Sequence, residues 1–171
     1  MKKHIQLFIF CIFIAGITST VHANDLKKFD ANSLASIKES YANRPFLLVL
    51  WSLECPSCYI ELDNLSAWLK TKPSIPLVLI STDSLDTQQE AFGLLSEYGL
   101  QKNDNWIFGS QAHIMLRQKI DPLWYGELPR SYLFDSQHTA HPHTGVLTKE
   151  HLKDIPRVLK SNIKRPYSRD P

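Results

Sequence analysis

The sequence predicts an α/β fold in which a central mixed β-sheet is flanked by helices. Two almost wholly apolar runs of strand length, Phe46–Ser52 and Leu77–Thr82, are typical of strands buried on both faces. Segments with helical spacing alternate with these runs along the chain, as in proteins whose helices cover a sheet. A further strand, a turn and a second extended segment near the C-terminus predict a closing hairpin.

The other elements follow from periodicity and from residues that begin or end helices. Helices are expected over residues 31–41, 56–69, 86–98, 112–120 and 148–160. Strands are expected over residues 106–108, 131–135 and 139–146. Asp86 is the expected cap of the third helix and Gly99 its stop, while Thr148 begins the last helix. The expected apolar face of the second helix contains Ile60, Leu62, Leu65, Trp68 and Leu69.

The first 23 residues have the features of a secretory signal peptide. Lys2 and Lys3 precede an apolar run from Ile5 to Ile17, and Val21 and Ala23 form a small-residue cleavage site. This run is short of the roughly 20 apolar residues that span a bilayer as a helix. We therefore expect cleavage after residue 23 and a periplasmic location, with a retained anchor that faces the periplasm as the alternative.

The exported chain is expected to form one domain with a neutral surface. Residues 24–162 suit a single core, and residues 163–171, with two prolines and no apolar pattern, are expected to be a flexible tail. Removing Lys2 and Lys3 from the 19 basic residues leaves 17, which equals the 17 acidic residues. This balance gives no reason to expect a nucleic-acid partner.

Two cysteines, Cys55 and Cys58, remain once Cys11 of the signal peptide is set aside. Cys55 stands where a buried strand ends and a helix begins, near unpaired backbone N–H groups and the positive end of the helix dipole, which favour a thiolate. Pro56 suits the first helical position because its missing N–H has no partner there. Cys58, one turn deeper, is placed to resolve a mixed disulfide, so the spacing predicts a redox-active dithiol.

Other uses of the two cysteines stay open at this stage. An inert disulfide would close too short a loop to stabilise the fold much. Zinc binding, or a copper chaperone, would need more ligands, and the richest source is His138, His141 and His143. A thiol peroxidase would also use one attacking cysteine, but positions 51–54 lack the threonine that such sites keep. We predict no bound metal and no cofactor.

The segment Trp51–Glu61, followed by Leu128, Pro129 and the strand 131–135, resembles the TlpA/ResA/DsbE group of thioredoxin-like proteins. The resemblance extends from about residue 31 to residue 155. It implies a thioredoxin fold with a strand and a helix inserted between its two halves. It also implies thiol:disulfide oxidoreductase activity at the dithiol.

The same resemblance implies roles for individual residues. Trp51 matches a family tryptophan four residues before the first cysteine, and Glu61 matches a glutamate associated with proton transfer at the thiols. Pro129 matches the family cis-proline, which with Leu128 would present backbone groups to an extended substrate segment. Trp51 and Pro56 are further expected substrate contacts. From the residues alone, Glu61 is equally a surface carboxylate, Pro129 an ordinary loop proline and Trp51 a core aromatic.

Glu54 departs from the family pattern, which usually has a tryptophan immediately before the first cysteine. A carboxylate beside Cys55 opposes its thiolate, which favours a reductant over a strong oxidant. The resemblance implies a disulfide reductase that acts on specific exported targets, such as apocytochrome c thiols or copper-site cysteines. It also implies that a membrane partner supplies the electrons. We expect the protein to be a monomer.

Overall fold

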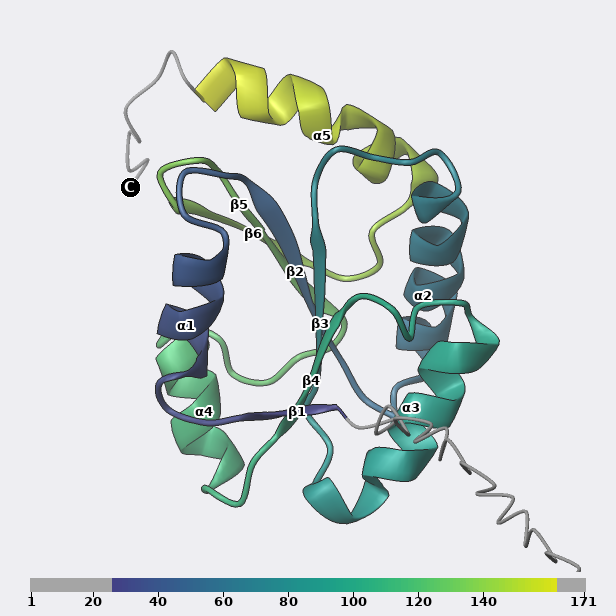
Figure 1. The fold of residues 1–171 in the computed structure, drawn as a ribbon, viewed down its shortest axis with the longest axis vertical. Coiled ribbons are helices and arrows are strands. Elements are labelled where there is room, and N and C mark those ends of the chain that lie inside the picture. The colour runs from purple at the N-terminus through teal and green to yellow at the C-terminus, as the bar shows by residue number, and fades with distance from the viewer. Residues whose placement is uncertain (1–25, 163–171) are drawn as a thin grey trace, which may run out of the picture.

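The computed structural model describes residues 26–162, which form a six-stranded mixed sheet with helices on both faces (Figure 1). The predicted signal peptide and C-terminal tail lie outside the described residues. In chain order the elements are β1 (Lys27–Phe29), α1 (Ser33–Ser40), β2 (Phe46–Trp51), α2 (Pro56–Leu69), β3 (Leu77–Ser81), η1 (Leu85–Thr87), α3 (Gln88–Glu97), β4 (Asp104–Phe108), α4 (His113–Ile120), β5 (Arg130–Phe134), β6 (Ala140–Thr144) and α5 (Lys149–Asn162). None of the helices in this range is long and apolar enough to cross a membrane.

The strand order is β1-β4-β3-β2-β5-β6, which places β2 inside the sheet. β2 runs parallel to β3 and antiparallel to β5, so that Leu48 lies opposite Val78 on one side and Tyr132 on the other. Every residue of β2 is buried, as its uninterrupted apolar sequence predicts. The helix α3, the strand β4 and the helix α4 lie between β3 and the closing hairpin of β5 and β6.

Alternate side chains of β2 belong to two hydrophobic clusters on opposite faces of the sheet. Leu47, Val49 and Trp51 pack with residues of α2, α3 and α5. Phe46, Leu48 and Leu50 pack with residues of α1 and α4 on the other face. In Figure 1, α1 and α4 accordingly lie on one side of the sheet and α2 and α3 on the other.

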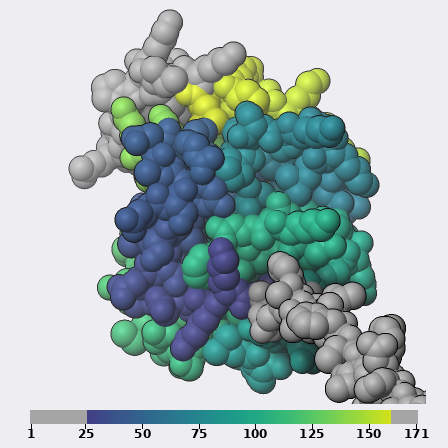
Figure 2. Space-filling model, in the orientation of Figure 1, coloured from purple at the N-terminus to yellow at the C-terminus, as the bar shows by residue number. Residues whose placement is uncertain are grey.

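The sequence did not predict β1, the strand at the edge of the sheet. β1 pairs in parallel with β4, with Lys27 opposite Trp106. Lys27 and Lys28 are exposed, and only Phe29 enters the core. In Figure 2 the purple residues of this region lie on the surface. Three residues with one buried side chain carry too little periodicity for a strand to be predicted.

Two of the predicted helix ends are present and one is wrong. Gly99 follows α3 with a φ of 70°, the left-handed conformation that ends helices. Thr148 caps α5, because its Oγ1 accepts the His151 N–H and its own N–H donates to His151 Nδ1. Asp86, predicted to cap α3, instead lies inside the 3-10 turn Leu85–Thr87, and α3 begins at Gln88.

The buried face of α2 differs from the predicted one at two adjacent positions. Ile60 is 60% exposed, whereas Glu61 has no exposed surface. The helix turns Cys58, Glu61, Leu62 and Leu65 toward the sheet, and Ile60 points away from it. A carboxylate thus occupies a core position that the apolar pattern would have assigned to isoleucine.

Candidate active site: the Cys55–Cys58 disulfide

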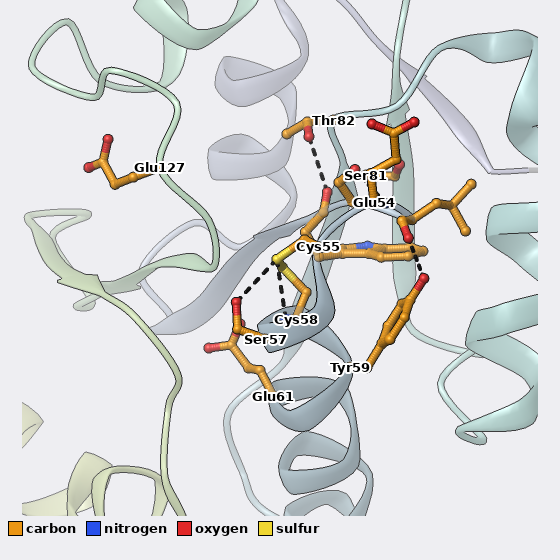
Figure 3. Close-up of a disulfide and its surroundings, with 12 residues drawn as sticks. Glu54, Cys55, Ser57, Cys58, Tyr59, Glu61, Ser81, Thr82 and Glu127 are labelled. Atoms are coloured by element: carbon orange, nitrogen blue, oxygen red, sulfur yellow. Dashed lines mark hydrogen bonds between the residues drawn. A yellow bond between two sulfur atoms is a disulfide. The ribbon is translucent and has the colours of Figure 1, made fainter.

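Cys55 and Cys58 form a disulfide at the first turn of α2 (Figure 3). Cys55 has an extended backbone and is the N-cap of the helix, and Pro56 occupies its first turn. The Cys58 N–H donates to the Cys55 Sγ over 3.2 Å. The sulfur therefore accepts the hydrogen bond that a capping side-chain oxygen accepts in other helices, in the field of the helix dipole. The same contact would stabilise a Cys55 thiolate once the disulfide is reduced.

The two sulfur-bearing residues differ in their access to solvent. Cys55 is 9% exposed and Cys58 is fully buried. Pro56 is exposed beside Cys55, and the Ser57 Oγ lies 3.5 Å from the Cys55 Sγ. An incoming thiol or disulfide can thus meet Cys55, whereas Cys58 is reachable only through it.

The turn formed by residues 52–54, which leads from β2 into Cys55, is held by the carboxylate of Asp83. The Ser52 Oγ donates to Asp83 Oδ1 over 2.6 Å, and the Leu53 N–H donates to Asp83 Oδ2 over 2.9 Å. The Ser81 Oγ donates to the same Oδ2 over 2.6 Å. Asp83 follows β3, the neighbour of β2 in the sheet. This one side chain therefore ties the approach to the disulfide to the end of the next strand.

Trp51, the last residue of β2, lies beneath this turn and is fully buried. Its carbonyl oxygen accepts the Thr82 N–H over 2.9 Å. The Tyr59 hydroxyl donates to the Leu53 carbonyl, which closes the turn from the side of α2 (Figure 3). Because Trp51 has no exposed surface, the direct substrate contact expected for it does not fit this structure, and its role is in the core.

Glu61 lies one turn beyond Cys58 on the buried face of α2 (Figure 3). Its Oε1 accepts the Leu147 N–H over 3.0 Å and the Ser131 Oγ hydroxyl over 3.2 Å. Within the described residues its Oε2 is buried without a hydrogen-bond partner. Burial raises the pKa of Glu61 to about 7, against the lowering effect of the two hydrogen bonds. Glu61 therefore exchanges its proton near neutral pH, which a surface carboxylate does not.

The Leu128–Pro129 peptide bond is cis, as the resemblance implies. Pro129 is buried and Leu128 is half-buried. Leu128 packs against the hydrophobic clusters of both faces of the sheet, and the Pro129 carbonyl accepts the Gly145 N–H over 2.9 Å. In Figure 3 the loop that bears Glu127 faces the disulfide. Of the two residues, Leu128 is therefore the one with surface to offer a partner.

The three histidines considered as metal ligands contact residues other than the two cysteines. His138 Nε2 is 3.0 Å from the Tyr41 carbonyl oxygen, and His141 Nε2 is 3.5 Å from Asp135 Oδ2. His143 stacks edge-on against His151, with ring centroids 4.6 Å apart. Within residues 26–162, no three His, Cys, Asp or Glu side chains are grouped to hold a metal ion.

Sequence reasoning missed Asp83 and Ser131, two polar residues that act on the site through others. Asp83 follows an apolar strand-length run, and the carboxyl ends of parallel neighbouring strands share one edge of a sheet. The position of Asp83 at the end of the strand next to β2 therefore indicates a place near Cys55. Ser131 reaches Glu61 across 70 residues of sequence, and only the register of β5 beside β2 reveals the contact.

Comparison with known proteins places this geometry in a described fold. No protein-family model matches the sequence, and no curated protein is significantly similar to it. Among solved structures, a secreted Mycobacterium tuberculosis disulfide oxidoreductase homologous to E. coli DsbE matches with a TM-score of 0.52 and 19% identity, over 72% of this chain and 85% of that chain.

Two further structures match over similar lengths. The thioredoxin-related protein of Neisseria meningitidis serogroup B matches with a TM-score of 0.55 and 20% identity, over 72% of this chain and 90% of that one. StoA of Bacillus subtilis matches with a TM-score of 0.51 and 20% identity, over 67% and 84%. The predicted thioredoxin-like fold is thereby confirmed.

Proposed function

We propose that this protein is an exported thiol:disulfide oxidoreductase that reduces disulfides in specific protein partners. The observation that carries the proposal is the asymmetry of the pair: Cys55 caps α2 and keeps 9% of its surface exposed, while Cys58 is fully buried one turn before Glu61. A structural disulfide needs neither an accessible sulfur nor a neighbouring carboxyl that titrates near neutral pH. The likeness to secreted oxidoreductases of the same fold supports this function.

The reaction begins with both cysteines reduced. The Cys55 thiolate attacks one sulfur of the partner's disulfide, forming a mixed disulfide and releasing the partner's other sulfur as a thiolate, which takes up a proton. The Cys58 thiolate then attacks the Cys55 Sγ and expels the second partner sulfur. Two electrons have passed to the partner, and the protein is left with the Cys55–Cys58 disulfide seen here.

Glu61 serves the second step in this proposal. Cys58 is buried, so its thiol needs a nearby group to accept its proton before it can attack. Glu61 lies one helical turn away on the same buried face, and its raised pKa matches the pH range in which a thiol begins to ionise. Leu128 and Pro129 would hold the partner segment beside Cys55, with Pro56 on the other side.

The location, the targets and the electron donor that we propose follow from the family resemblance. We place the protein in the periplasm, with apocytochrome c thiols or copper-site cysteines as its targets. A membrane-bound dithiol would return two electrons to the Cys55–Cys58 disulfide after each turnover. The carboxylate of Glu54 next to Cys55 opposes the Cys55 thiolate, which supports a reductant over a strong oxidant.

Cysteine variants test the proposal directly. The chain with Cys58→Ser should form a stable mixed disulfide with a disulfide-containing peptide, whereas Cys55→Ser should form none. The double variant Cys55→Ser/Cys58→Ser is the control for reaction at any other site. Mass spectrometry of the trapped adduct gives the result. Trapping through Cys58 in the Cys55→Ser chain, at a rate equal to that of Cys58→Ser, would overturn the proposed order of attack.

A further inference from the structure

The segment that joins β6 to α5, residues 145–148, is hydrogen-bonded to both Pro129 and Glu61. The Gly145 N–H donates to the Pro129 carbonyl over 2.9 Å. Two residues later, the Leu147 N–H donates to Glu61 Oε1 over 3.0 Å. We call this segment the β6–α5 connection. Because it contacts both the cis-proline and the carboxyl one turn beyond the dithiol, its position affects how the two are held.

The connection ends in a capping box at the start of α5, in which a histidine occupies the position usual for glutamate or glutamine. The Thr148 carbonyl accepts the Leu152 N–H over 3.0 Å, and the Thr148 Oγ1 accepts the His151 N–H over 3.3 Å. In return the Thr148 N–H donates to His151 Nδ1 over 3.2 Å. In an ordinary capping box a glutamate or glutamine, three residues after the cap, accepts this bond. A histidine nitrogen accepts it only while that nitrogen is unprotonated.

The hydrogen bond between Thr148 and His151 determines the form of the histidine ring. A backbone N–H is always the donor, so His151 Nδ1 accepts and the ring is neutral. A proton on Nδ1 would set two donors against each other and break the bond. It would also add a positive charge to the first turn of α5, where the helix dipole opposes one. The Thr148 N–H, next in the chain to Leu147, would then lose its acceptor.

A second histidine packs against the first. The rings of His143 on β6 and His151 are edge-on, with centroids 4.6 Å apart, and His143 Nε2 lies 3.4 Å from the Val146 carbonyl oxygen of the connection. Burial lowers the pKa of His143, and positive charge on His151 acts in the same direction, against the hydrogen bond to Val146. Charged side chains beside the two rings include Arg130 of β5 and the exposed Lys149 and Glu150 of α5. A proton on one ring therefore opposes a proton on the other.

We propose that neutral His151 is a positioning residue for Glu61, because it accepts the Thr148 N–H and so holds the adjacent Leu147 N–H against the carboxyl. Protonation of His151 releases the β6–α5 connection and loosens the bond from Leu147 to Glu61. Histidine is the side chain that ordinarily changes its charge between pH 5 and 8. The connection is therefore tight at neutral pH and looser in mild acid. The effect on the reaction of the dithiol rests on the function proposed above, whereas the effect on the connection does not.

Hydrogen exchange of single backbone amides in the full, oxidised chain tests the inference without any substrate. From pH 7.5 to pH 5 the protection factors of the Leu147 and Thr148 amides, which correct for the intrinsic effect of pH on exchange, should fall about tenfold. His151→Asn offers an oxygen in place of Nδ1 that does not titrate, so it should keep the protection at both pH values. His151→Ala should lack it at both. An unchanged parent chain, or an equal fall in His151→Asn, would overturn the inference.

Two control variants assign the fall in protection to His151. Glu61 titrates in the same pH range, so the exchange measurement is repeated in Glu61→Gln, whose amide oxygen can still accept the Leu147 N–H. The fall should persist there, and its disappearance would assign it to Glu61 and overturn the inference. His138→Asn, in the turn between β5 and β6, is the matched histidine control and should keep the pH dependence of the parent chain.

The pH profile of peptide disulfide reduction by the pre-reduced chain tests the positioning role. The bond from the Leu147 N–H lowers the pKa of Glu61 against the effect of burial. Loosening it in His151→Ala should therefore move the inflection near pH 7 upward, and His151→Asn should restore it. An inflection that stays in place in His151→Ala would overturn the positioning role. Failure of the proposed function is distinguishable, because then the parent chain itself would reduce no peptide, while the hydrogen-exchange results would be unaffected.

Discussion

Glu61 and Leu147, 86 residues apart in sequence, are joined by a buried hydrogen bond of 3.0 Å from the Leu147 N–H to Glu61 Oε1. The bond ties α2, which carries the disulfide, to the segment that leads from the closing hairpin into α5. The Asn64 amide donates to the carbonyl of the same Leu147 over 3.1 Å. The carboxyl one turn beyond the dithiol is therefore part of the packing of the C-terminal half, and we expect its ionisation to affect stability as well as the proposed reaction.

The first prediction concerns stability and pH. The pKa of Glu61 is about 7 in the folded chain, against 4.5 for an ordinary glutamate. Between these values the folded chain binds a proton that the unfolded chain has lost, so the free energy of unfolding falls as the pH rises through this window. The loss is up to about 3 kcal/mol. Urea unfolding of the oxidised protein should show it.

The variant Glu61→Gln isolates this contribution because its amide oxygen can still accept the Leu147 N–H. At pH 5 its stability should be close to that of the parent chain, and at pH 8 it should be the more stable of the two. Glu97→Gln, at an exposed position, serves as the control. A stability difference between parent and Glu61→Gln that does not change with pH would contradict the burial argument.

The second prediction concerns the rate of disulfide reduction. Replacing Glu61 by Gln removes the group that would accept the Cys58 proton, and the rate constant for the resolving step should fall by about 100-fold near pH 7. The pH profile of the variant should lose its inflection near pH 7, while Glu61→Asp should keep one. Rapid mixing of the fully reduced chain with a disulfide-containing peptide, followed by acid quenching of the transient mixed disulfide, gives the constant. A Gln variant with the parent profile would remove Glu61 from the mechanism.

The third prediction concerns the turn that precedes Cys55. Asp83→Ala leaves the Ser52 and Ser81 hydroxyls and the Leu53 N–H without their acceptor. The expected loss of stability is about 1–3 kcal/mol. Asp83→Asn, which keeps one acceptor oxygen, should lose less.

A second readout separates positioning from stability alone. If the turn places Cys55, Asp83→Ala should also change the alkylation rate of Cys55 in the reduced protein at neutral pH. The matched control is Asp86→Ala, at an exposed position three residues later. Equal stability of the Asp83→Ala and Asp86→Ala chains would show that the hydrogen bonds to Asp83 contribute nothing.

The fourth prediction compares two aliphatic residues of α2. Leu62 is fully buried and Ile60 is 60% exposed. Leu62→Ala should cost about 2–5 kcal/mol through the cavity it leaves, and Ile60→Ala should change stability by less than about 0.5 kcal/mol. Denaturant unfolding measures both. Similar costs would mean that Ile60 packs against the protein after all.

Local signals in the sequence were enough for the elements around the disulfide. The apolar run of β2 and the proline and cysteine spacing of α2 predicted both elements, and the bounds of α2 agree with the structure at both ends. The cis bond at Pro129 came from the family resemblance and not from spacing. For β2 and α2 the deciding information lies within a short stretch of chain.

The features that the sequence did not reveal depend on contacts between distant segments. Glu61 is buried and Ile60 exposed because α2 rotates its cysteine face toward the sheet, a choice that the apolar pattern alone opposes. Asp83 reaches the turn before Cys55 from 30 residues away. No local pattern carries the orientation of a helix on a sheet or a hydrogen bond between two loops.

The placement of β1 has a consequence for the order in which the chain is completed. Among the strands that the structure describes, β1 comes first and pairs only with β4, and Phe29 lies opposite Phe108. A growing polypeptide therefore makes its opening strand long before the neighbour that gives it hydrogen bonds exists. Until residue 108 has been added, this segment can find no native partner, and a nascent chain that stops short of it would leave one flank of the sheet unfinished.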